Sequence, residues 1–349
     1  MRSRSPAPSR ERAVTGDPPA TILLTGATGL VGSHAARLFR ERGWNVRALA
    51  RPSSDVRFLE GLDVTVVLGD VTEPASLSGA AEGCEAVVHA AAVLGEGAPW
   101  ERFREVNVEG TRNVLSEAVR AGCRRFVHLS SVAVYGDPAG LPRPLDEDVA
   151  PEGSLGPRAH YERSKRMAES AVRRGADGMV SWTVLRPALV TGERDRHFAP
   201  RVAALADRRF VPILGRGDNP LPLVYAGDVA EACRRAVVRE EAHGRTFVVA
   251  DEGRLTQRQL LRDAAPRGAT LVPLPRGAVE AAARAAERAA ELNPGGPSRV
   301  WTSRRVRLLG RPDPFEAARI RRDLGWRPEV GAREGWRRTL RWLWRETRR

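Results

Sequence analysis

The first half of the chain alternates short apolar runs with stretches in which apolar residues recur every three or four positions. The apolar runs predict strands, and the recurring pattern predicts helices between them. Strands that are apolar throughout are typical of a parallel sheet covered by helices on both faces. The pattern therefore predicts an α/β fold with a doubly wound parallel sheet, the Rossmann fold. The predicted strands are residues 21–25, 45–50, 63–68, 86–90, 125–130 and 180–186. The first predicted helix follows the first strand and ends at about residue 42, and two further helices cover 100–121 and 158–174.

Beyond about residue 190 this alternation becomes irregular. Residues 279–292 form an alanine-rich helical stretch that stops at Asn293-Pro294-Gly295-Gly296. Near the C-terminus, Trp336, Leu340 and Leu343 share one helical face among many arginines. This favours a helix that packs on the protein, with a membrane-surface helix as the less favoured alternative.

These differences divide the chain into three parts. Residues 1–18 are rich in Pro, Ser and Arg and contain no apolar stretch, so we expect a disordered leader and not a secretion signal. Residues 19–190 are the predicted Rossmann domain. Residues 191–349 are the predicted smaller substrate lobe with the C-terminal helices, from which the chain can cross back to the sheet.

Composition narrows the class of protein. The net charge is +14, but the arginines are spread along the chain and aromatic residues make up only 5%, which makes nucleic-acid binding an unfavoured interpretation. No window of 18 apolar residues occurs, so we expect no membrane span. Cys84, Cys123 and Cys233 are far apart and match no metal spacing. Reduced thiols in the cytoplasm and no bound metal are therefore expected.

A glycine-rich turn follows the first predicted strand. Gly26, Gly29 and Gly32 form GxxGxxG where a strand ends and a helix begins. Glycines there allow a tight turn and a close approach of the backbone to a pyrophosphate, and the helix N-terminus attracts phosphate. The second strand ends at Arg51, followed by Ser53 and Ser54. No acidic residue lies between the start of that strand and Asp55. This set favours the 2′-phosphate of NADP over the ribose hydroxyls of NAD.

One lysine stands among 56 arginines. Lys165 comes four residues after Tyr161, so both side chains leave the same face of a helix. A compact ammonium fits between a phenol and a sugar hydroxyl better than the rigid fork of arginine. The pair on its own is weak evidence, because YxxxK also occurs by chance.

An ordered set of segments resembles one family. The set runs from about residue 20 to the C-terminus and comprises Thr25-Gly26-Ala27-Thr28-Gly29-Leu30-Val31-Gly32, Gly69-Asp70-Val71, Val88-His89-Ala90-Ala91-Ala92, Asn107-Val108-Glu109-Gly110-Thr111, His128-Leu129-Ser130-Ser131, Tyr161 with Lys165, Leu185-Arg186-Pro187 and Asp323-Leu324-Gly325-Trp326-Arg327-Pro328. Together these segments resemble the extended short-chain dehydrogenase/reductase family, also called the NAD-dependent epimerase/dehydratase family.

The resemblance implies roles for individual residues. Tyr161 would be the general acid/base, and Lys165 would bind the nicotinamide ribose and lower the pKa of Tyr161. Ser131, or Ser130 if the register shifts by one, would hydrogen-bond the reacting oxygen, and Asn107 would hold the structure around the lysine. The implied cofactor-binding set is Gly26, Thr28, Gly29, Leu30, Val31, Gly32, Arg51, Asp70, Val71, Ala90, Ala91, Ala92, Ser130, Tyr161, Lys165 and Pro187.

Three details bear on the branch of the family. Val132-Ala133 stands where the sugar dehydratases carry an Asp-Glu pair, so that branch is excluded. Leu189 stands where nucleotide-sugar epimerases place an asparagine, which favours an apolar substrate. Two segments resemble the 3β-hydroxysteroid dehydrogenase and dihydroflavonol reductase side of the family. These are Gly192-Glu193-Arg194-Asp195 and Val224-Tyr225-Ala226-Gly227-Asp228-Val229-Ala230.

The sequence therefore predicts an NAD(P)-dependent oxidoreductase. It would move a hydride between nicotinamide and a secondary alcohol or ketone on an apolar or ring-bearing small molecule. A nucleotide-sugar epimerase is the second interpretation, and a non-catalytic dinucleotide sensor or RNA-binding protein is the third. Relatives in such a family often form homodimers, so the resemblance leaves a homodimer as an alternative to a monomer.

Overall fold

The computed structural model describes residues 20–94, 98–137, 141–142, 144–151, 153–156, 159–176, 178–251, 253, 255–265, 268–292, 306–307 and 314–347. The predicted leader, residues 1–18, and the predicted helix stop at 293–296 lie outside these ranges.

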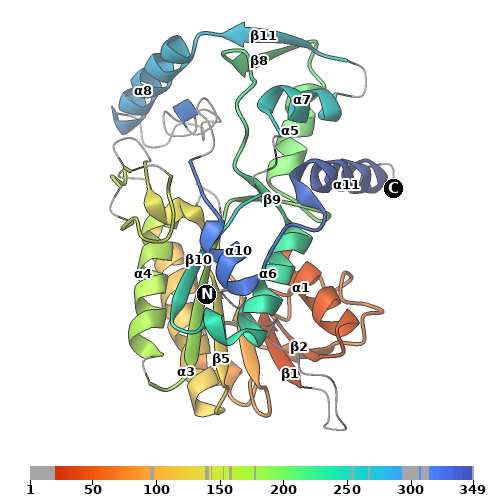
Figure 1. Ribbon diagram of the computed structural model, residues 1–349, viewed down its shortest axis with the longest axis vertical. Helices are drawn as coiled ribbons and strands as arrows, with labels where there is room; N and C mark the ends of the chain where they lie inside the picture. The colour runs from red at the N-terminus through yellow and green to blue at the C-terminus, as the bar shows by residue number, and fades with distance from the viewer. Residues whose placement is uncertain are drawn as a thin grey trace, which may run out of the picture.

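Seven parallel strands form the central sheet, in the order β10-β6-β5-β4-β1-β2-β3. The doubly wound α/β fold predicted from the sequence is confirmed (Figure 1). The six predicted strands lie within about two residues of their expected bounds, and the seventh, β10, comes from beyond residue 190. The strands are β1 (Thr21–Thr25), β2 (Asn45–Ala50), β3 (Thr65–Leu68), β4 (Ala86–His89), β5 (Arg125–Leu129), β6 (Ser181–Pro187) and β10 (Arg245–Val249).

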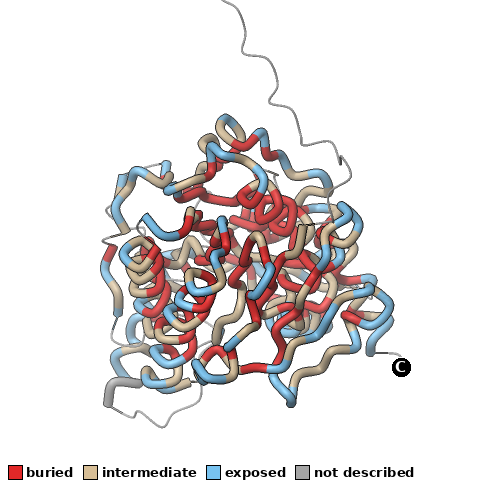
Figure 2. The backbone as a smooth tube through the Cα atoms, turned by 90° about the horizontal axis from the view of Figure 1, so that it is seen from below, coloured by how far each residue is buried: buried red, intermediate tan, exposed pale blue. Residues whose placement is uncertain are grey.

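Alternation along the strands divides the core into two layers. Ile22 and Leu24 of β1 belong to the apolar cluster that includes α1 (Leu30–Glu41) and α6 (Ala226–Val238). Leu23, between them, belongs to the cluster that includes α3 (Gly110–Arg120) and α4 (His160–Gly175). Because successive side chains of a strand point to opposite faces, both faces of the sheet are buried under helices. Figure 2 shows buried residues throughout the interior of the molecule.

The stretch predicted as one helix over 100–121 is three consecutive elements. A short α2 (Trp100–Phe103) is followed by a π-helical turn, η2 (Arg104–Glu109), and then by α3. The extra residue per turn shifts the face that the side chains present, and π-turns often occur at functional sites. Asn107 lies within this turn. Shorter 3-10 turns occur at η1 (Pro74–Leu77), η3 (Val132–Tyr135) and η4 (Glu240–Ala242).

The second part of the chain builds a lobe with its own core. Two small parallel pairs, β7 with β9 and β8 with β11, join the helices there. Figure 1 shows β8, β11 and α8 at the end of the molecule farthest from the sheet. The elements are β7 (Leu189–Thr191), α5 (Phe198–Ala206), β8 (Phe210–Leu214), β9 (Leu223–Tyr225), α7 (Gln257–Ala264), β11 (Thr270–Leu274), α8 (Arg276–Leu292), α10 (Ala318–Leu324) and α11 (Gly331–Glu346).

The C-terminal helix α11 packs on this lobe through one apolar face. Trp336, Leu340 and Leu343 are buried in the cluster that also contains α5 and α7, as the shared helical face predicted. Asp228 of α6 fixes the approach to α11, since its carboxylate accepts hydrogen bonds from three successive backbone amides at 2.9–3.1 Å. No helix of the described residues is long and apolar enough to cross a membrane.

Candidate functional site

The glycine turn brings the first and fourth strands together. Gly26 has a φ of +67°, and a Cβ there would lie 2.7 Å from the backbone of Ala90 and of Ala91. A Cβ on Gly32 would lie 2.1 Å from the Gly26 carbonyl oxygen. Neither clash can be relieved by rotating a side chain, so both positions require glycine.

The N-terminus of α1 opens onto this turn. Gly29 is the residue before the helix, so no side chain caps the first amides, and the first turn carries no acidic residue. Thr28, Leu30 and Val31 beside it are half-buried. Free amides at the positive end of a helix dipole suit a phosphate group. The residues present therefore fit a dinucleotide, as the sequence predicted.

Residues after β2 and β3 lie at the same edge of the sheet. Arg51 is exposed, and its backbone amide donates to the Ser54 hydroxyl at 3.2 Å. Asp70 is half-buried, and its Oδ1 accepts bonds from the amide and the hydroxyl of Thr72, both at 2.9 Å. These bonds lower the pKa of Asp70 although partial burial opposes its ionisation, so the carboxylate is ionised at neutral pH.

The other predicted cofactor residues are less exposed. Val71 is buried, and a Cβ on Gly110 would lie 2.8 Å from its side chain. Ala92 is half-buried in the segment after β4, and Pro187 is buried as the last residue of β6.

Lys165 lies under the end of β5. Its side chain is 3% exposed, and its ammonium donates a hydrogen bond to the Leu129 carbonyl at 2.8 Å. Burial lowers the pKa of Lys165 to about 8, while the charge of Glu169, one helical turn on, opposes that shift. Tyr161, one turn earlier, is half-buried and packs edge-on against Phe103, with ring centroids 6.5 Å apart.

The two candidate serines have different surroundings. Ser130 is buried, and its hydroxyl donates to Glu169 at 2.7 Å. Ser131 is half-buried and caps η3, where its oxygen accepts the Ala133 amide at 3.1 Å. The hydroxyl proton of Ser130 is therefore already committed to a carboxylate, and this favours Ser131 as the donor to a substrate oxygen.

Asn107 links the segment after β4 to helix α4. Its Oδ1 accepts the Val93 amide at 2.7 Å, and its Nδ2 donates to the Val93 carbonyl at 3.1 Å and to the Ser164 hydroxyl at 2.9 Å. The Ser164 hydroxyl in turn donates to the Tyr161 carbonyl at 2.7 Å. These bonds use both ends of the amide and hold the first turn of α4, which carries Tyr161, in position.

A buried ionic network behind Lys165 was not expected. Arg186 of β6 is 2% exposed and donates two bonds to the Glu169 carboxylate, at 2.9 and 2.8 Å, and a third to the Tyr135 hydroxyl at 2.9 Å. Burial would raise the pKa of Glu169, but the bonds from Arg186 hold it below its ordinary value. Glu169 also carries the bond from Ser130, so the network fixes both α4 and the end of β5.

A signal for this network was present in the sequence. Glu169 follows Lys165 at helical spacing, and Arg186 interrupts an apolar strand. A charge within a buried strand requires a partner. Only the fold shows that the partner comes from α4.

Two stacked histidines lie near the same lysine. His89 and His128, on adjacent strands, have ring centroids 5.5 Å apart. His89 is hydrogen-bonded to Thr25 at 2.7 Å and to Thr111 at 3.0 Å, whereas neither ring nitrogen of His128 has a partner among the described residues. Burial, and then the charge of Lys165, lowers the pKa of His89 to about 3 and that of His128 well below its usual value, so both rings are neutral.

The comparisons with known proteins identify the family. The sequence profile of the NAD dependent epimerase/dehydratase family matches residues 22–250. The chain therefore belongs to this family, and it is an enzyme of the extended short-chain dehydrogenase/reductase type. The resemblance inferred from the motifs is confirmed.

Curated relatives include reductases and an epimerase. The chain is 27% identical to 2-alkyl-3-oxoalkanoate reductase of Stenotrophomonas maltophilia, over 91% of this chain and 97% of that protein. It is 30% identical to N-acetyl-alpha-D-glucosaminyl-diphospho-ditrans,octacis-undecaprenol 4-epimerase of Escherichia coli, over 69% of this chain and 70% of that protein. The match to sterol demethylase protein B of Methylococcus capsulatus is 39% identical, but it spans 50% of this chain and only about half, 53%, of that relative.

Solved structures share the whole architecture. The crystal structure of gox2253 superposes with a TM-score of 0.75 at 26% identity, covering 94% of this chain and 99% of that one. The lobe after residue 190 is therefore part of the shared fold.

Proposed function

We propose that this protein is an NADP(H)-dependent ketoreductase that acts on a secondary alcohol or ketone of a largely apolar molecule. The observation that carries the proposal is the setting of Lys165. It is a buried ammonium held by the Leu129 carbonyl, one helical turn from Tyr161 and directly behind the strand end that carries Ser131. This arrangement suits proton transfer next to a bound nicotinamide.

The nicotinamide of the bound cofactor supplies or accepts the hydride. In the reducing direction, the Tyr161 hydroxyl gives its proton to the carbonyl oxygen as the carbon receives the hydride. Ser131 donates a hydrogen bond to the same oxygen and Lys165 lowers the pKa of the phenol, because a nearby cation favours phenolate. An unperturbed tyrosine, with a pKa of about 10, exchanges its proton poorly at neutral pH.

Arg51 supports the choice of NADP(H). Its side chain is exposed at the end of β2, and Ser54 lies beside it. A guanidinium and a hydroxyl there would bind a 2′-phosphate, whereas NAD selection usually relies on a carboxylate at this strand end.

The proposed substrate class follows from the site and from the relatives. Aromatic rings lie at the start of α4, where Phe103 packs against Tyr161 and His160, and Trp100 packs against His160. Leu94, which precedes α2 in the chain, is 54% exposed. Two relatives carry names that refer to an alkyl chain or a ring system, a 2-alkyl-3-oxoalkanoate and a sterol. A ketone on an alkyl or ring framework fits both observations.

A second candidate function is epimerisation of a lipid-linked sugar. The similarity to an undecaprenol-linked sugar epimerase, over 69% of this chain, favours it, although Leu189 replaces the asparagine of nucleotide-sugar enzymes. An epimerase oxidises and re-reduces the same carbon and keeps its cofactor. A reductase releases oxidised cofactor in each turnover, so net consumption of NADPH separates the two functions.

The decisive test replaces the proposed acid/base. We expect Tyr161→Phe to lower kcat by on the order of a thousandfold or more while the affinity for NADPH stays within a factor of about two. Tyr225→Phe is the matched control, because its hydroxyl donates to Glu193 at 2.7 Å on another element. Normal turnover by Tyr161→Phe, or an equal loss in the control, would refute the assignment.

The cofactor is tested by titration with NADPH and NADH side by side. Arg51→Gln should weaken NADPH binding by about tenfold or more and leave NADH binding unchanged. Arg42→Gln, which changes another exposed arginine directly after α1, should alter the binding of neither cofactor. Tighter binding of NADH by the unmodified protein would make Arg51 a surface residue.

A further inference from the structure

The outer face of α11 carries a row of arginines that the proposed chemistry does not use. Arg333, Arg337, Arg341 and Arg345 recur every four residues and all are exposed. At a rise of about 1.5 Å per residue, the row extends about 18 Å along the helix. The opposite face is buried in the lobe, so the helix is fixed in place and the row points away from the core.

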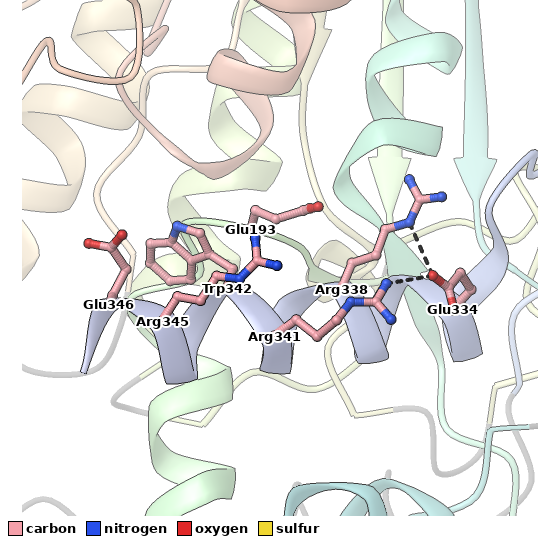
Figure 3. Close-up of a pocket in the computed structure, with 7 residues that line it drawn as sticks. All are labelled: Glu193, Glu334, Arg338, Arg341, Trp342, Arg345 and Glu346. Carbon is pink, nitrogen blue, oxygen red and sulfur yellow. Dashed lines mark hydrogen bonds and ion pairs between the residues drawn. The ribbon is translucent and has the colours of Figure 1, made fainter. Parts of the chain in front are cut away.

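Few carboxylates offset these charges. The helix contains five arginines and two glutamates. Glu334 is shared between Arg338 at 3.3 Å and Arg341 at 2.8 Å, and both bonds are drawn in Figure 3. No carboxylate of the described residues forms an ion pair with Arg333, Arg337 or Arg345. The face therefore keeps a net positive charge at neutral pH.

The same face is hollowed beside a tryptophan. A cavity of about 540 Å³ is lined by Trp342 together with three arginines and three glutamates, which are Arg338, Arg341, Arg345, Glu193, Glu334 and Glu346. Figure 3 shows the Trp342 ring next to the Arg345 and Glu193 side chains. Trp342 and Trp344 are only partly buried. Tryptophan is enriched at the boundary between bilayer and water, and arginine binds phosphate oxygens bidentately.

We propose that α11 docks the enzyme on anionic phospholipid bilayers, with headgroup phosphates bound by the arginine row and Trp342 at its edge. The bilayer as occupant rests on the proposed function, because an apolar ketone dissolves in a membrane and not in water. Adsorption would be electrostatic, since the apolar face of α11 is already occupied by the lobe. Each arginine near an anionic surface strengthens binding severalfold, and salt weakens it.

The test compares two sets of three substitutions that change net charge equally. One set, Arg333→Gln, Arg337→Gln and Arg345→Gln, removes arginines of α11 without breaking an ion pair. The control set, Arg42→Gln, Arg124→Gln and Arg174→Gln, removes exposed arginines from the turn after α1, from the turn before β5 and from α4. Both sets and the unmodified chain are sedimented with vesicles of phosphatidylcholine alone and of phosphatidylcholine mixed with phosphatidylglycerol.

We expect the unmodified chain and the control set to bind only the anionic vesicles, and the α11 set to bind them about tenfold to a hundredfold more weakly. Binding of the α11 set as tight as that of the unmodified chain overturns the proposal, as does an equal loss in the control set. Binding to neutral vesicles, or tighter binding to RNA than to anionic vesicles at the same ionic strength, also overturns it.

Turnover separates this proposal from the catalytic one. The α11 set should reduce a short, water-soluble ketone at the unmodified rate, because none of its residues belongs to the proposed site. Vesicle binding needs neither cofactor nor substrate. If the α11 set loses binding to anionic vesicles, the result supports docking even if no ketone is reduced. If the unmodified chain reduces the ketone but binds no vesicles, the result refutes docking and leaves the catalytic proposal intact.

Discussion

Two arginines in different halves of this molecule differ in burial, one being buried and the other exposed. In the sheet domain, Arg186 is 2% exposed and its guanidinium is bound on two sides by Glu169 and Tyr135. On α11, Arg341 is 54% exposed and shares Glu334 with a neighbour. Both arginines are ion-paired, yet only the first pair has lost its water. Burial, and not the presence of a salt bridge, decides how much such a pair contributes to stability.

The difference also separates positioning from recognition. The buried network holds α4 and the end of β5 in a single arrangement, and the proposed catalytic side chains depend on that arrangement. The exposed arginines hold nothing in place and are available to ligands from outside. An ion pair in the first region should be sensitive to substitution and insensitive to salt, and the reverse should hold in the second.

The largest expected effect comes from removing one carboxylate in each region. Glu169→Ala leaves Arg186 buried without its counter-charge, which should lower the free energy of unfolding by about 3–5 kcal/mol. Glu334→Ala breaks two exposed pairs and should cost at most about 1 kcal/mol. Urea denaturation followed by circular dichroism measures both. Similar losses for the two variants would contradict the comparison.

The pH dependence of Lys165 should give two opposite trends. Its pKa is about 8 in the fold against an ordinary 10.5, because burial disfavours the ammonium more than Glu169 favours it, and the neighbouring His89 and His128 are neutral. As the pH rises through about 8 the ammonium loses its proton, so kcat/KM should fall. Between about 8 and 10.5 the unfolded chain binds more protons than the folded one, so the unfolding free energy should rise over that window.

Lys165→Met provides the control for both trends. The variant has no ammonium in either state, so its stability should lack the rise between pH 8 and 10.5 that the unmodified chain shows. Unfolding midpoints across that range measure the difference. A stability curve with the same slope in both proteins would place the pKa of Lys165 near its ordinary value.

A smaller effect should distinguish the two stacked histidines. His128→Phe removes a buried ring whose nitrogens have no partner among the described residues, and it should stabilise the fold by roughly 1 kcal/mol. His89→Phe removes the bonds to Thr25 and Thr111 and should destabilise it by about 1–3 kcal/mol. Opposite shifts in melting temperature are expected. A loss of stability in both variants would point to a partner of His128 such as a buried water.

The smallest expected change in stability comes from replacing the two serines, Ser130 and Ser131. Ser130→Ala should cost about 1–2 kcal/mol of stability, because Glu169 loses a bond from a buried hydroxyl. Ser131→Ala should leave stability nearly unchanged and lower kcat by about tenfold to a hundredfold. Denaturation and steady-state kinetics on both variants provide the comparison. The reverse outcome would assign the catalytic hydroxyl to Ser130.

The sequence predicted those features that depend on neighbouring residues. Apolar runs located six of the seven strands, and the spacing of Gly26, Gly29 and Gly32 predicted the turn at α1, because steric limits on a tight turn act over a few positions. Tyr161 and Lys165 were predicted to lie on one helix because their spacing of four residues corresponds to one helical turn. Which roles these residues have remains a prediction.

Features that depend on distant parts of the chain were missed. The pairing of Glu169 with Arg186 joins α4 to β6, and the return of β10 to the sheet joins residues 245–249 to β6. The π-turn at 104–109 was predicted as regular helix, because periodicity over a long window does not reveal one extra residue in a turn. Each of these is set by packing between elements that local pattern cannot place.

Because the chain has a single lysine, chemical modification of amines can report on the exposure of the candidate site. Lys165 is the only side-chain amine in 349 residues, and it is 3% exposed. An amine-specific acylating reagent can therefore modify a side chain of the folded protein only when Lys165 leaves its buried position at the Leu129 carbonyl. The rate at which Lys165 is acylated, followed by mass spectrometry, therefore measures how often the site opens. No label, probe or engineered cysteine has to be introduced.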